Sequence, residues 1–244
     1  MNIMVFTDNK FMYEKLVKII ELRELDKENI FTYACSKNNA LFEKSIEVKK
    51  INIKDNVEEI ILNYNLVISC HSKQIFPNKL IHSLRCINIH PGYNPYNRGW
   101  YPQVFSILNN HPLGVTIHEM DEEIDHGDII VQKELTSYSW DTSLTLYNRI
   151  LELEVELLNE NIEFLIQGTY KTFPMHGEGN YNSKQDYNKL CELDLTKKAT
   201  TKDVIDQLRA LTHGNFNNAY FIDKHGDKIF VKIILEKEET TYES

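Results

Sequence analysis

Residues 86–110 read CINIHPGYNPYNRGWYPQVFSILNN, a short apolar strand pattern that leads into a polar loop and then into a helix pattern. Side chains alternate along a strand, so Asn88 and His90 face one side and Ile89 faces the other. In an open α/β sheet, ligands bind beyond the carboxyl ends of the strands. We therefore expect the loop after His90 to border a binding site.

Outside this stretch, strand and helix patterns continue to alternate along the chain. Apolar runs predict strands, and apolar residues at helical spacing predict helices. This order predicts an α/β sheet covered by helices, with the late strands as candidates for antiparallel pairing. The expected strands cover residues 1–6, 30–35, 65–70, 86–90, 114–120 and 128–135, and the expected helices cover 11–25, 57–64, 98–110 and 143–167.

The composition and the pattern of strands and helices change near residue 170. Residues 172–184 are rich in Gly, Asn and Pro, which predicts a loop. A helix pattern at 202–211 and two strand patterns at 219–223 and 228–235 follow, the strands flanking a KHGDK turn. We expect a main domain over residues 1–175 and a small C-terminal α+β appendage over residues 176–244.

The composition narrows the class of protein. The chain has 244 residues, a net charge of -9, and no apolar stretch near the ~20 residues of a membrane span. The negative charge argues against a nucleic-acid partner, and the start of the chain lacks the pattern of a secretory signal. The four cysteines have neither zinc-site spacing nor disulfide density. We expect a cytoplasmic protein with reduced thiols and no membrane span.

A second polar cluster, EMDEEIDHGDII, covers residues 119–130. Asp128 stands directly before an apolar run, where a buried carboxylate needs a partner such as an imidazole. The residues alone leave simpler interpretations open. Asn88 and His90 could only satisfy backbone groups in a turn, and the acidic segment could be a solvated hairpin turn.

Three parts of the sequence together resemble the folate-dependent formyltransferases. The pattern joins an Asn-x-His at 88–90, a loop from Pro95 through Arg98-Gly99 to Pro102, and an Asp-x-Gly-Asp at 125–128. The match spans roughly residues 65–135. The wording HPGYNPYNRGWYPQVFSI at 90–107 is similar to the branch that acts on dTDP-linked amino-dideoxy sugars, and less so to the methionyl-tRNA or glycinamide-ribonucleotide enzymes.

The resemblance implies a Rossmann-like fold and a catalytic trio of Asn88, His90 and Asp128. Asn88 would donate to the oxygen on which negative charge develops during formyl transfer. His90 would be a second donor or manage the proton of the amine, and Asp128 would orient the imidazole or accept that proton. The formyl donor would be 10-formyltetrahydrofolate, and no metal is expected.

The resemblance also implies two sets of binding residues. The expected folate-binding residues are Ser72, Lys73, Gln74, Ile75, Phe76, Glu122, Glu123, Ile124 and Asp125. The expected sugar-nucleotide residues are Tyr93, Asn94, Tyr96, Arg98, Trp100, His213, Asn215, Phe216 and Asn217. Several have plainer alternatives: Ile75, Phe76 and Trp100 as core residues, Lys73 as a surface charge or a phosphate ligand, Arg98 as a loop support, and His213 beside a helix C-cap.

The activity implied by the resemblance is formylation of a nucleotide-linked amino sugar, with dTDP-4-amino-4,6-dideoxyglucose as the preferred acceptor. The product would serve bacterial O-antigen or another surface polysaccharide, and the enzyme would be a homodimer. Three alternatives remain open: a dTDP-3-amino sugar as the acceptor, hydrolysis of 10-formyltetrahydrofolate to formate, and a non-catalytic sugar-nucleotide binding protein.

Overall fold

The computed structural model describes residues 1–42 and 47–238. Its centre is a seven-stranded sheet with the order β3-β2-β1-β4-β5-β7-β8. The first five strands in this order pair in parallel, and β7 pairs antiparallel with both β5 and β8. The predicted mostly parallel sheet with antiparallel late strands is confirmed. The strands are β1 (Asn2–Thr7), β2 (Ile30–Ser36), β3 (Val48–Ile51), β4 (Leu66–Cys70), β5 (Arg85–His90), β7 (Gly114–Glu119) and β8 (Ile129–Glu134).

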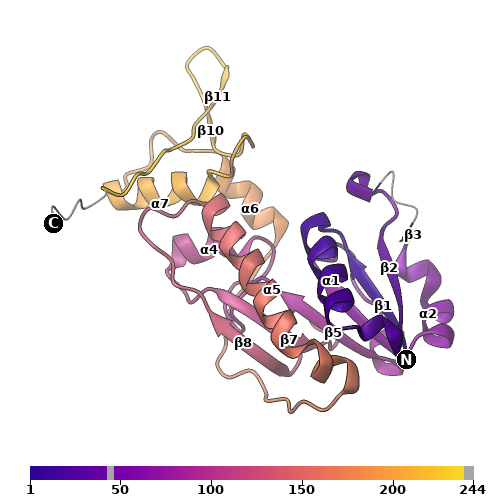
Figure 1. Cartoon of the computed structure of the whole chain (residues 1–244). Helices are drawn as coiled ribbons and strands as arrows, with labels where there is room; N and C mark the ends of the chain where they lie inside the picture. Colours follow the sequence, from indigo (N-terminus) through magenta and orange to yellow (C-terminus); the bar gives the residue numbers. More distant parts are fainter. Residues whose placement is uncertain (43–46, 239–244) are drawn as a thin grey trace, which may run out of the picture.

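Helices cover both faces of the sheet (Figure 1). Alternation along β1 divides its apolar side chains between two cores. Ile3 and Val5 belong to the core beneath α1, α4 and α5, whereas Met4 and Phe6 belong to the core beneath α2 and α3. A strand buried on both faces is apolar throughout, which explains the continuous run at the start of the chain. The helices are α1 (Lys10–Leu22), α2 (Val57–Asn63), α3 (Asn78–Ser83), α4 (Pro102–Asn109) and α5 (Ser143–Gln167).

The long helix α5 has the bounds that its apolar periodicity predicts. Thr142 caps its N-terminus in a capping box with Thr145, and Gly168 ends it in the left-handed conformation at φ 69°. Its buried residues are apolar except for Ser143 at its start and Glu154, whose side chain is fully buried. That carboxylate lies beneath the site described below.

The predicted helix over residues 98–110 begins later than expected. Arg98 and Gly99 form the short strand β6 (Arg98–Gly99), which pairs with β9 (Tyr181–Asn182). Tyr101 then adopts a left-handed φ of 54°, so helical geometry starts only at Pro102. The pairing of β6 with β9 ties the loop after β5 to the segment that leads into the appendage.

The C-terminal part contains two helices and a hairpin that projects from the molecule (Figure 1). The hairpin has the predicted turn, and α7 packs on α4 and α5. The elements are α6 (Lys184–Cys191), α7 (Thr201–Leu211), β10 (Tyr220–Ile222) and β11 (Lys228–Phe230). The domain division at residue 175 stays a prediction. Across the described ranges, no helix is long and apolar enough to cross a bilayer.

Candidate active site

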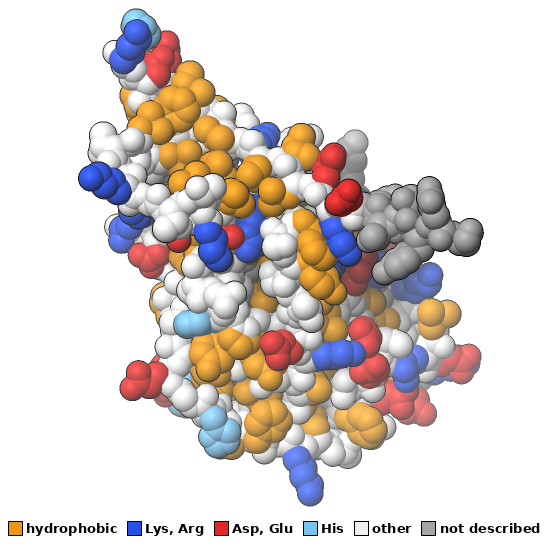
Figure 2. Space-filling view, turned by 90° about the vertical axis from the view of Figure 1, so that its left-hand side faces the viewer, with side chains coloured by type: hydrophobic (Ala, Val, Ile, Leu, Met, Phe, Trp, Pro, Cys, Tyr) orange, Lys and Arg blue, Asp and Glu red, His pale blue; other side chains and the backbone are white. Residues whose placement is uncertain are grey.

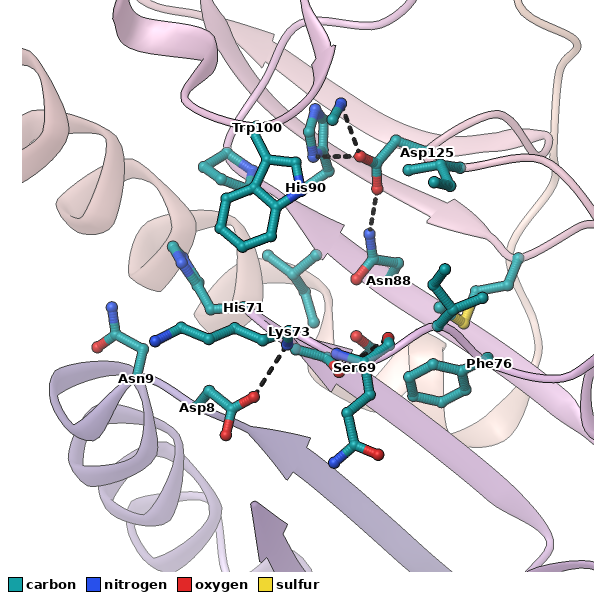
Figure 3. A pocket seen from close by; sticks show the side chains of 18 of the residues that line it. Asp8, Asn9, Ser69, His71, Lys73, Phe76, Asn88, His90, Trp100 and Asp125 are labelled. Carbon is teal, nitrogen blue, oxygen red and sulfur yellow. Dashed lines mark hydrogen bonds and ion pairs between the residues drawn. The ribbon is translucent and has the colours of Figure 1, made fainter. Parts of the chain in front are cut away.

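A cavity of about 590 Å³ opens at the carboxyl ends of the central strands (Figure 3). Its walls come from the loops after β1 and β4, the end of β5, and the loop between β7 and β8. The strand order reverses between β1 and β4, and such a reversal is where open α/β sheets bind ligands. The sheet topology therefore explains why the cavity lies here.

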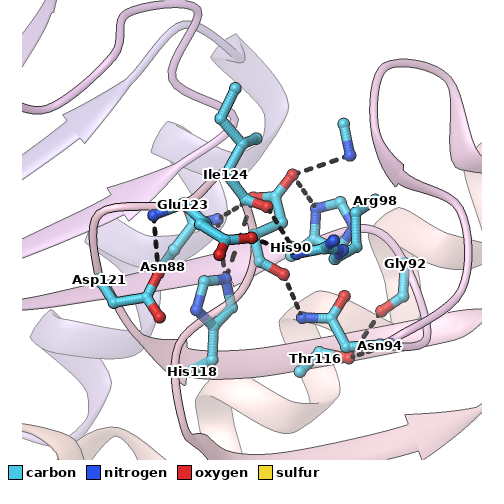
Figure 4. A network of polar contacts seen from close by, with 12 residues as sticks. Asn88, His90, Gly92, Asn94, Arg98, Thr116, His118, Asp121, Glu123 and Ile124 are labelled. Atoms are coloured by element: carbon cyan, nitrogen blue, oxygen red, sulfur yellow. Dashed lines mark hydrogen bonds and ion pairs between the residues drawn. The ribbon is translucent and has the colours of Figure 1, made fainter. Parts of the chain in front are cut away.

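Asn88, His90 and Asp125 form the polar centre of this cavity (Figures 3 and 4). Nδ2 of Asn88 donates to Oδ1 of Asp125 at 2.9 Å, and Nδ1 of His90 lies 3.3 Å from Oδ2. The backbone N–H of Gly99 donates to Oδ2 at 3.0 Å, and the side chain of Asn94 donates to the Asp125 carbonyl at 2.9 Å. As strand alternation predicts, Asn88 and His90 face one space together.

The structure corrects the expected place of Asp128. This side chain is exposed and lies outside the cavity, with Thr172 as its polar contact at 3.5 Å. Gly127 packs so tightly against the Glu119 carbonyl that a Cβ would overlap it, and β8 begins directly after Asp128. The tight turn sends Asp128 away, and Asp125, expected in the folate set, is the carboxylate that contacts Asn88 and His90.

His118 supports Asn88 from the neighbouring strand. The two residues are paired across β5 and β7, and Nδ1 of His118 lies 2.7 Å from the Glu119 carbonyl. A carbonyl can only accept, so Nδ1 carries the proton and Nε2 is an acceptor, 3.3 Å from Nδ2 of Asn88. The amide of Asn88 thus donates on both sides. The sequence analysis did not identify His118, although its spacing of two residues from Thr116 places both side chains on the same face of β7.

The two buried histidines are held neutral. Burial lowers the pKa of His90 and of His118 from the usual 6.5, and this effect exceeds the opposing attraction of the Asp125 carboxylate. Nε2 of His90 is buried and has no hydrogen-bond partner among the described residues. With its proton on Nδ1 facing Asp125, His90 offers a lone pair at Nε2 that can accept a proton from a substrate.

The loop after β4 forms the opposite wall. The buried carboxylate of Asp8 accepts from the N–H of Lys73 and also from Ser36 and Asn39, which fixes this loop against the end of β2. From that anchor the Lys73 side chain extends between Asn9 and His71 (Figure 3). All five residues expected in this segment line the cavity: Ser72, Lys73, Gln74, Ile75 and Phe76.

Two members of this segment also have structural roles. Gln74 bonds to Ser36, to the Ile51 carbonyl and to the N–H of Ile53, so its side chain joins the ends of β2 and β3. Phe76 is buried and packs edge-on against Phe6. Phe76 is therefore a core residue, as the alternative proposed, and it also lines the cavity wall, as predicted.

The loop between β7 and β8 supplies the rim. Glu122, Glu123 and Ile124 line the cavity as expected. Arg98 contacts Glu123 at 3.6 Å and the Ile124 carbonyl at 3.5 Å. Arg98 therefore supports this loop, as its plainer interpretation proposed, and it does not line the cavity.

Most of the residues expected to bind the sugar nucleotide lie elsewhere. Trp100 lines the cavity, but Asn94 is buried beside it, and Tyr96 packs against His111. Tyr93 is half-buried outside the cavity walls. His213 contacts Ser143 at 3.0 Å and the ring of Tyr147, so it lies behind the cavity wall. Its neighbours are exposed on the surface: Asn215, Phe216 and Asn217.

The cavity contains further polar residues that the sequence did not reveal. Asn9 caps α1 and donates to the hydroxyl of Tyr147 at 2.9 Å. His71 bonds to Glu154, on the buried face of α5. An acidic residue at an apolar position of a helix is a signal that could have indicated this pair. Throughout the described residues, no group of three or more His, Cys, Asp or Glu side chains could hold a metal ion.

Comparison with known proteins agrees with this geometry. Residues 4–162 match the family model described as formyl transferase. The chain belongs to the formyl transferase family. Residues 186–237 of this formyltransferase also match the model described as the N-formyltransferase dimerization C-terminal domain.

Three similar proteins illustrate the relationship. The dTDP-4-amino-4,6-dideoxyglucose formyltransferase of Mycobacterium bovis is 46% identical over 192 residues, which cover 79% of this chain and 82% of the relative. A 4-N formyltransferase structure from Francisella tularensis is 48% identical with a TM-score of 0.92, covering 97% of this chain and 98% of the other. The formyltransferase PseJ from Anoxybacillus kamchatkensis, solved with UDP-4,6-dideoxy-4-formamido-L-AltNAc and tetrahydrofolate, is 25% identical with a TM-score of 0.61, covering 86% and 98%.

Proposed function

We propose that this formyltransferase moves the formyl group of 10-formyltetrahydrofolate to the 4-amino group of dTDP-4-amino-4,6-dideoxyglucose. The observation that carries the proposal is the neutral His90, whose Nε2 is free while Nδ1 faces Asp125 in the cavity. Similarity to the Mycobacterium bovis enzyme and to the 4-N formyltransferase of Francisella tularensis supports this acceptor.

Apolar residues beside the catalytic cluster suit a folate. Phe76, Ile81, Met120 and Ile124 line this part of the cavity. Planar heterocycles bind such walls through apolar contact and a few hydrogen bonds to the backbone. When bound, the folate supplies the formyl carbon that the amine attacks. The tetrahydrofolate bound in the relative from Anoxybacillus kamchatkensis supports a folate-type donor.

The three central side chains divide the chemistry between them. Nε2 of His90 accepts the proton that the attacking amine loses, and the Asp125 carboxylate stabilises the resulting imidazolium through Nδ1. The imidazolium then returns the proton to N10 of the folate as the bond between N10 and the formyl carbon breaks. Asp125 and His118 hold the Asn88 amide in place before substrate binds, and they accept both of its hydrogens. When substrate binds, Nδ2 exchanges the longer bond, to His118, for a bond to the oxygen on which negative charge develops. This assigns to Asp125 the role first expected of Asp128.

The sugar nucleotide would occupy the other half of the cavity. Lys73 and Asn9 border this half, and Trp100 provides an aromatic surface near His90 (Figure 3). A lysine can pair with a diphosphate, and an aromatic ring can cover a sugar face or a base. We assign Lys73 to the diphosphate, the alternative to folate contact that its sequence left open.

Product mass tests the proposed function. The protein is incubated with 10-formyltetrahydrofolate and a panel of dTDP- and UDP-linked 3-amino and 4-amino sugars. We expect a formyl mass gain on dTDP-4-amino-4,6-dideoxyglucose. A mass gain only on a 3-amino sugar would show that the acceptor is a 3-amino sugar. Release of formate with no mass gain on any sugar would show that the enzyme is a hydrolase and that the proposed transfer is wrong.

We further propose that the enzyme is a homodimer joined through its C-terminal part. The matched dimerization domain covers α6, α7 and the hairpin. Figure 2 shows apolar side chains gathered on this projecting region. Apolar residues exposed together are typical of association surfaces. They include Leu195, Val204, Phe216, Ile222, Ile229, Phe230 and Ile234.

We place the reaction in the cytoplasm, upstream of a bacterial surface polysaccharide. All four cysteines are free, and three of them are buried. Unpaired thiols are usual in a reducing compartment.

A further inference from the structure

A buried ion pair lies beneath the Lys73 side of the cavity and has no part in the chemistry described above. Nε2 of His71 is 2.7 Å from Oε2 of Glu154. The Glu154 side chain has no exposed surface, and its Oε1 has no hydrogen-bond partner in the described chain. Burying a carboxylate on an apolar helix face is costly. Such a residue at this position indicates a function beyond packing.

Glu154 determines which nitrogen of His71 remains available. The bond to Glu154 uses Nε2, and no hydrogen bond within the described residues uses Nδ1. When His71 is protonated, Nδ1 carries a hydrogen that can be donated to a ligand. When a proton on Glu154 is shared with Nε2 of a neutral ring, Nδ1 again carries the hydrogen. Nδ1 is therefore a donor whenever the pair holds this proton, which the raised pKa of the buried Glu154 carboxyl favours.

The backbone also holds His71 in an uncommon conformation at the cavity wall. His71 follows the last residue of β4 and has a left-handed φ of 57°. Non-glycine residues rarely adopt this region, and they gather at functional sites. His71 lines the cavity beside Lys73, whose side chain extends past it toward Asn9 (Figure 3).

The neighbouring groups make this corner suited to an anion. Both oxygens of Asp8 are occupied by hydrogen bonds to Ser36, Asn39 and Lys73. Burial raises the pKa of the Cys70 thiol far above its usual value and that of the Tyr147 hydroxyl to about 12, so both stay neutral. Lys10 and Lys73 are the lysines that line the cavity, and a protonated His71 would add a positive charge beside Lys73.

We propose that His71 binds a phosphoryl oxygen of the sugar nucleotide through its Nδ1–H, and that Glu154 is the positioning residue that keeps this donor in place. The inference rests on the proposed function, because it names a contact within the same acceptor site. Lys73 would supply a mobile point charge, and His71 a donor in a fixed direction.

The same arrangement would couple acceptor binding to the catalytic imidazole. A positive charge on His71 lowers the pKa of His90, in addition to the larger effect of burial. A protonated His71 would therefore help to keep Nε2 of His90 free to accept a proton.

The test measures dTDP binding to the full chain by calorimetry, independently of turnover. His71→Asn combined with Glu154→Gln removes the imidazole without leaving a buried charge unpaired, and asparagine tolerates a left-handed φ. We expect dTDP affinity to fall about 10-fold or more, the loss typical of a charge-assisted hydrogen bond. Tetrahydrofolate affinity should change less than 2-fold by the same scale.

Glu154→Gln alone separates positioning from packing. Without the carboxylate, the imidazole loses the charged partner that fixes its direction, so dTDP affinity should fall while tetrahydrofolate affinity stays within about 2-fold. Glu152→Gln, an exposed change on the same helix, should leave both affinities unchanged. A role in packing alone would lower the melting temperature without a selective loss of dTDP affinity.

The outcomes separate this inference from the proposed function. Wild-type dTDP affinity in the double variant or in Glu154→Gln overturns the role of the pair while the formyl transfer stands. If the wild type itself fails to bind dTDP, then both the dTDP-linked acceptor and the contact with His71 are wrong.

Discussion

Oδ2 of Asp125 lies 3.3 Å from Nδ1 of His90, and Oδ1 of the same carboxylate accepts from Asn88 at 2.9 Å. One side chain thereby orients both groups that would act on the substrate. The backbone of Asp125 has a left-handed φ of 51°, its carbonyl accepts from Asn94, and the preceding Ile124 carbonyl accepts from Arg98. The loop that carries Asp125 is thus part of the proposed catalytic arrangement.

Asp125→Asn should lower kcat by about 100-fold or more, within the usual contribution of general acid–base catalysis. The amide keeps the shape but cannot stabilise an imidazolium at His90. Initial rates with the formyl donor and the amino sugar nucleotide measure the effect, and calorimetry with tetrahydrofolate verifies that the folate site persists.

Asp128→Asn is the matched control, because it makes the same chemical change three residues away at an exposed position. We expect its kcat to remain within about 2-fold of the wild type, as is usual for surface substitutions. An equal loss in both variants would restore Asp128 to the catalytic set.

His118→Asn should reduce kcat about 10-fold with little change in KM, the loss expected for one buried hydrogen bond. The asparagine amide can still donate toward the Glu119 carbonyl, but the acceptor for Asn88 is lost. Asn88 would then rotate away from its working direction. His176→Asn alters an exposed histidine and should have no effect. Full activity in His118→Asn would show that Asp125 orients Asn88 alone.

The sequence predicts the fold well wherever an element buries a large apolar face. Helix α5 and the central strands follow from periodicity alone. The elements it missed are short or polar: VKKI in β3, the six residues of α3, and KQDYNKLC in α6. Their contacts with the rest of the protein stabilise them, and local patterns do not record such contacts.

The relative position of two site residues was predictable when both lie on the same strand. Alternation brought Asn88 and His90 together, but the choice between Asp125 and Asp128 depended on a turn whose direction the residue types do not specify. The prediction that residues of the His213–Phe216 turn line the binding site was wrong for a similar reason. Its distance from the cavity is set by the packing of α7 on α4 and α5, which is tertiary information.

The stability of the protein should fall as pH drops below about 6.5. Burial depresses the pKa values of His90 and His118, so the unfolded chain takes up protons that the folded chain refuses. Stability from these groups is present above their unfolded pKa and is lost as pH falls toward the folded value. Each histidine contributes a slope of at most about 1.4 kcal/mol per pH unit in that window.

Urea unfolding at several values between pH 8 and pH 5.5 measures this slope. In His118→Asn one titrating group is gone, so the slope should decrease by about half if the two histidines contribute equally. The same slope in the variant and the wild type would show that other groups dominate the acid response.

Phe230→Asp should convert the proposed dimer into monomers. Phe230 is 46% exposed on the projecting hairpin, where a charge would oppose burial against a second copy. Light scattering after size exclusion gives the molar mass. Leu62→Asp is the control, because this equally apolar and still more exposed side chain lies on α2, outside the matched dimerization domain. Dissociation by Leu62→Asp, or a dimeric Phe230→Asp, would place the interface elsewhere.

Gly92→Ala should abolish most activity while the protein stays folded. A Cβ at Gly92 would overlap the imidazole of His90, so the ring must rotate away from Asp125. The backbone of Gly92 is outside the left-handed region, and alanine is therefore tolerated there without backbone strain.

The substitutions Gly92→Ala and His90→Ala both remove the same imidazole from its place beside Asp125. Adding His90→Ala to Gly92→Ala should therefore lower kcat little further, which is the non-additivity expected of groups in contact. Rates and melting temperatures of the two single variants and the double variant measure whether the losses are additive. Fully additive losses in kcat would mean that Gly92 affects catalysis by another route than the position of His90.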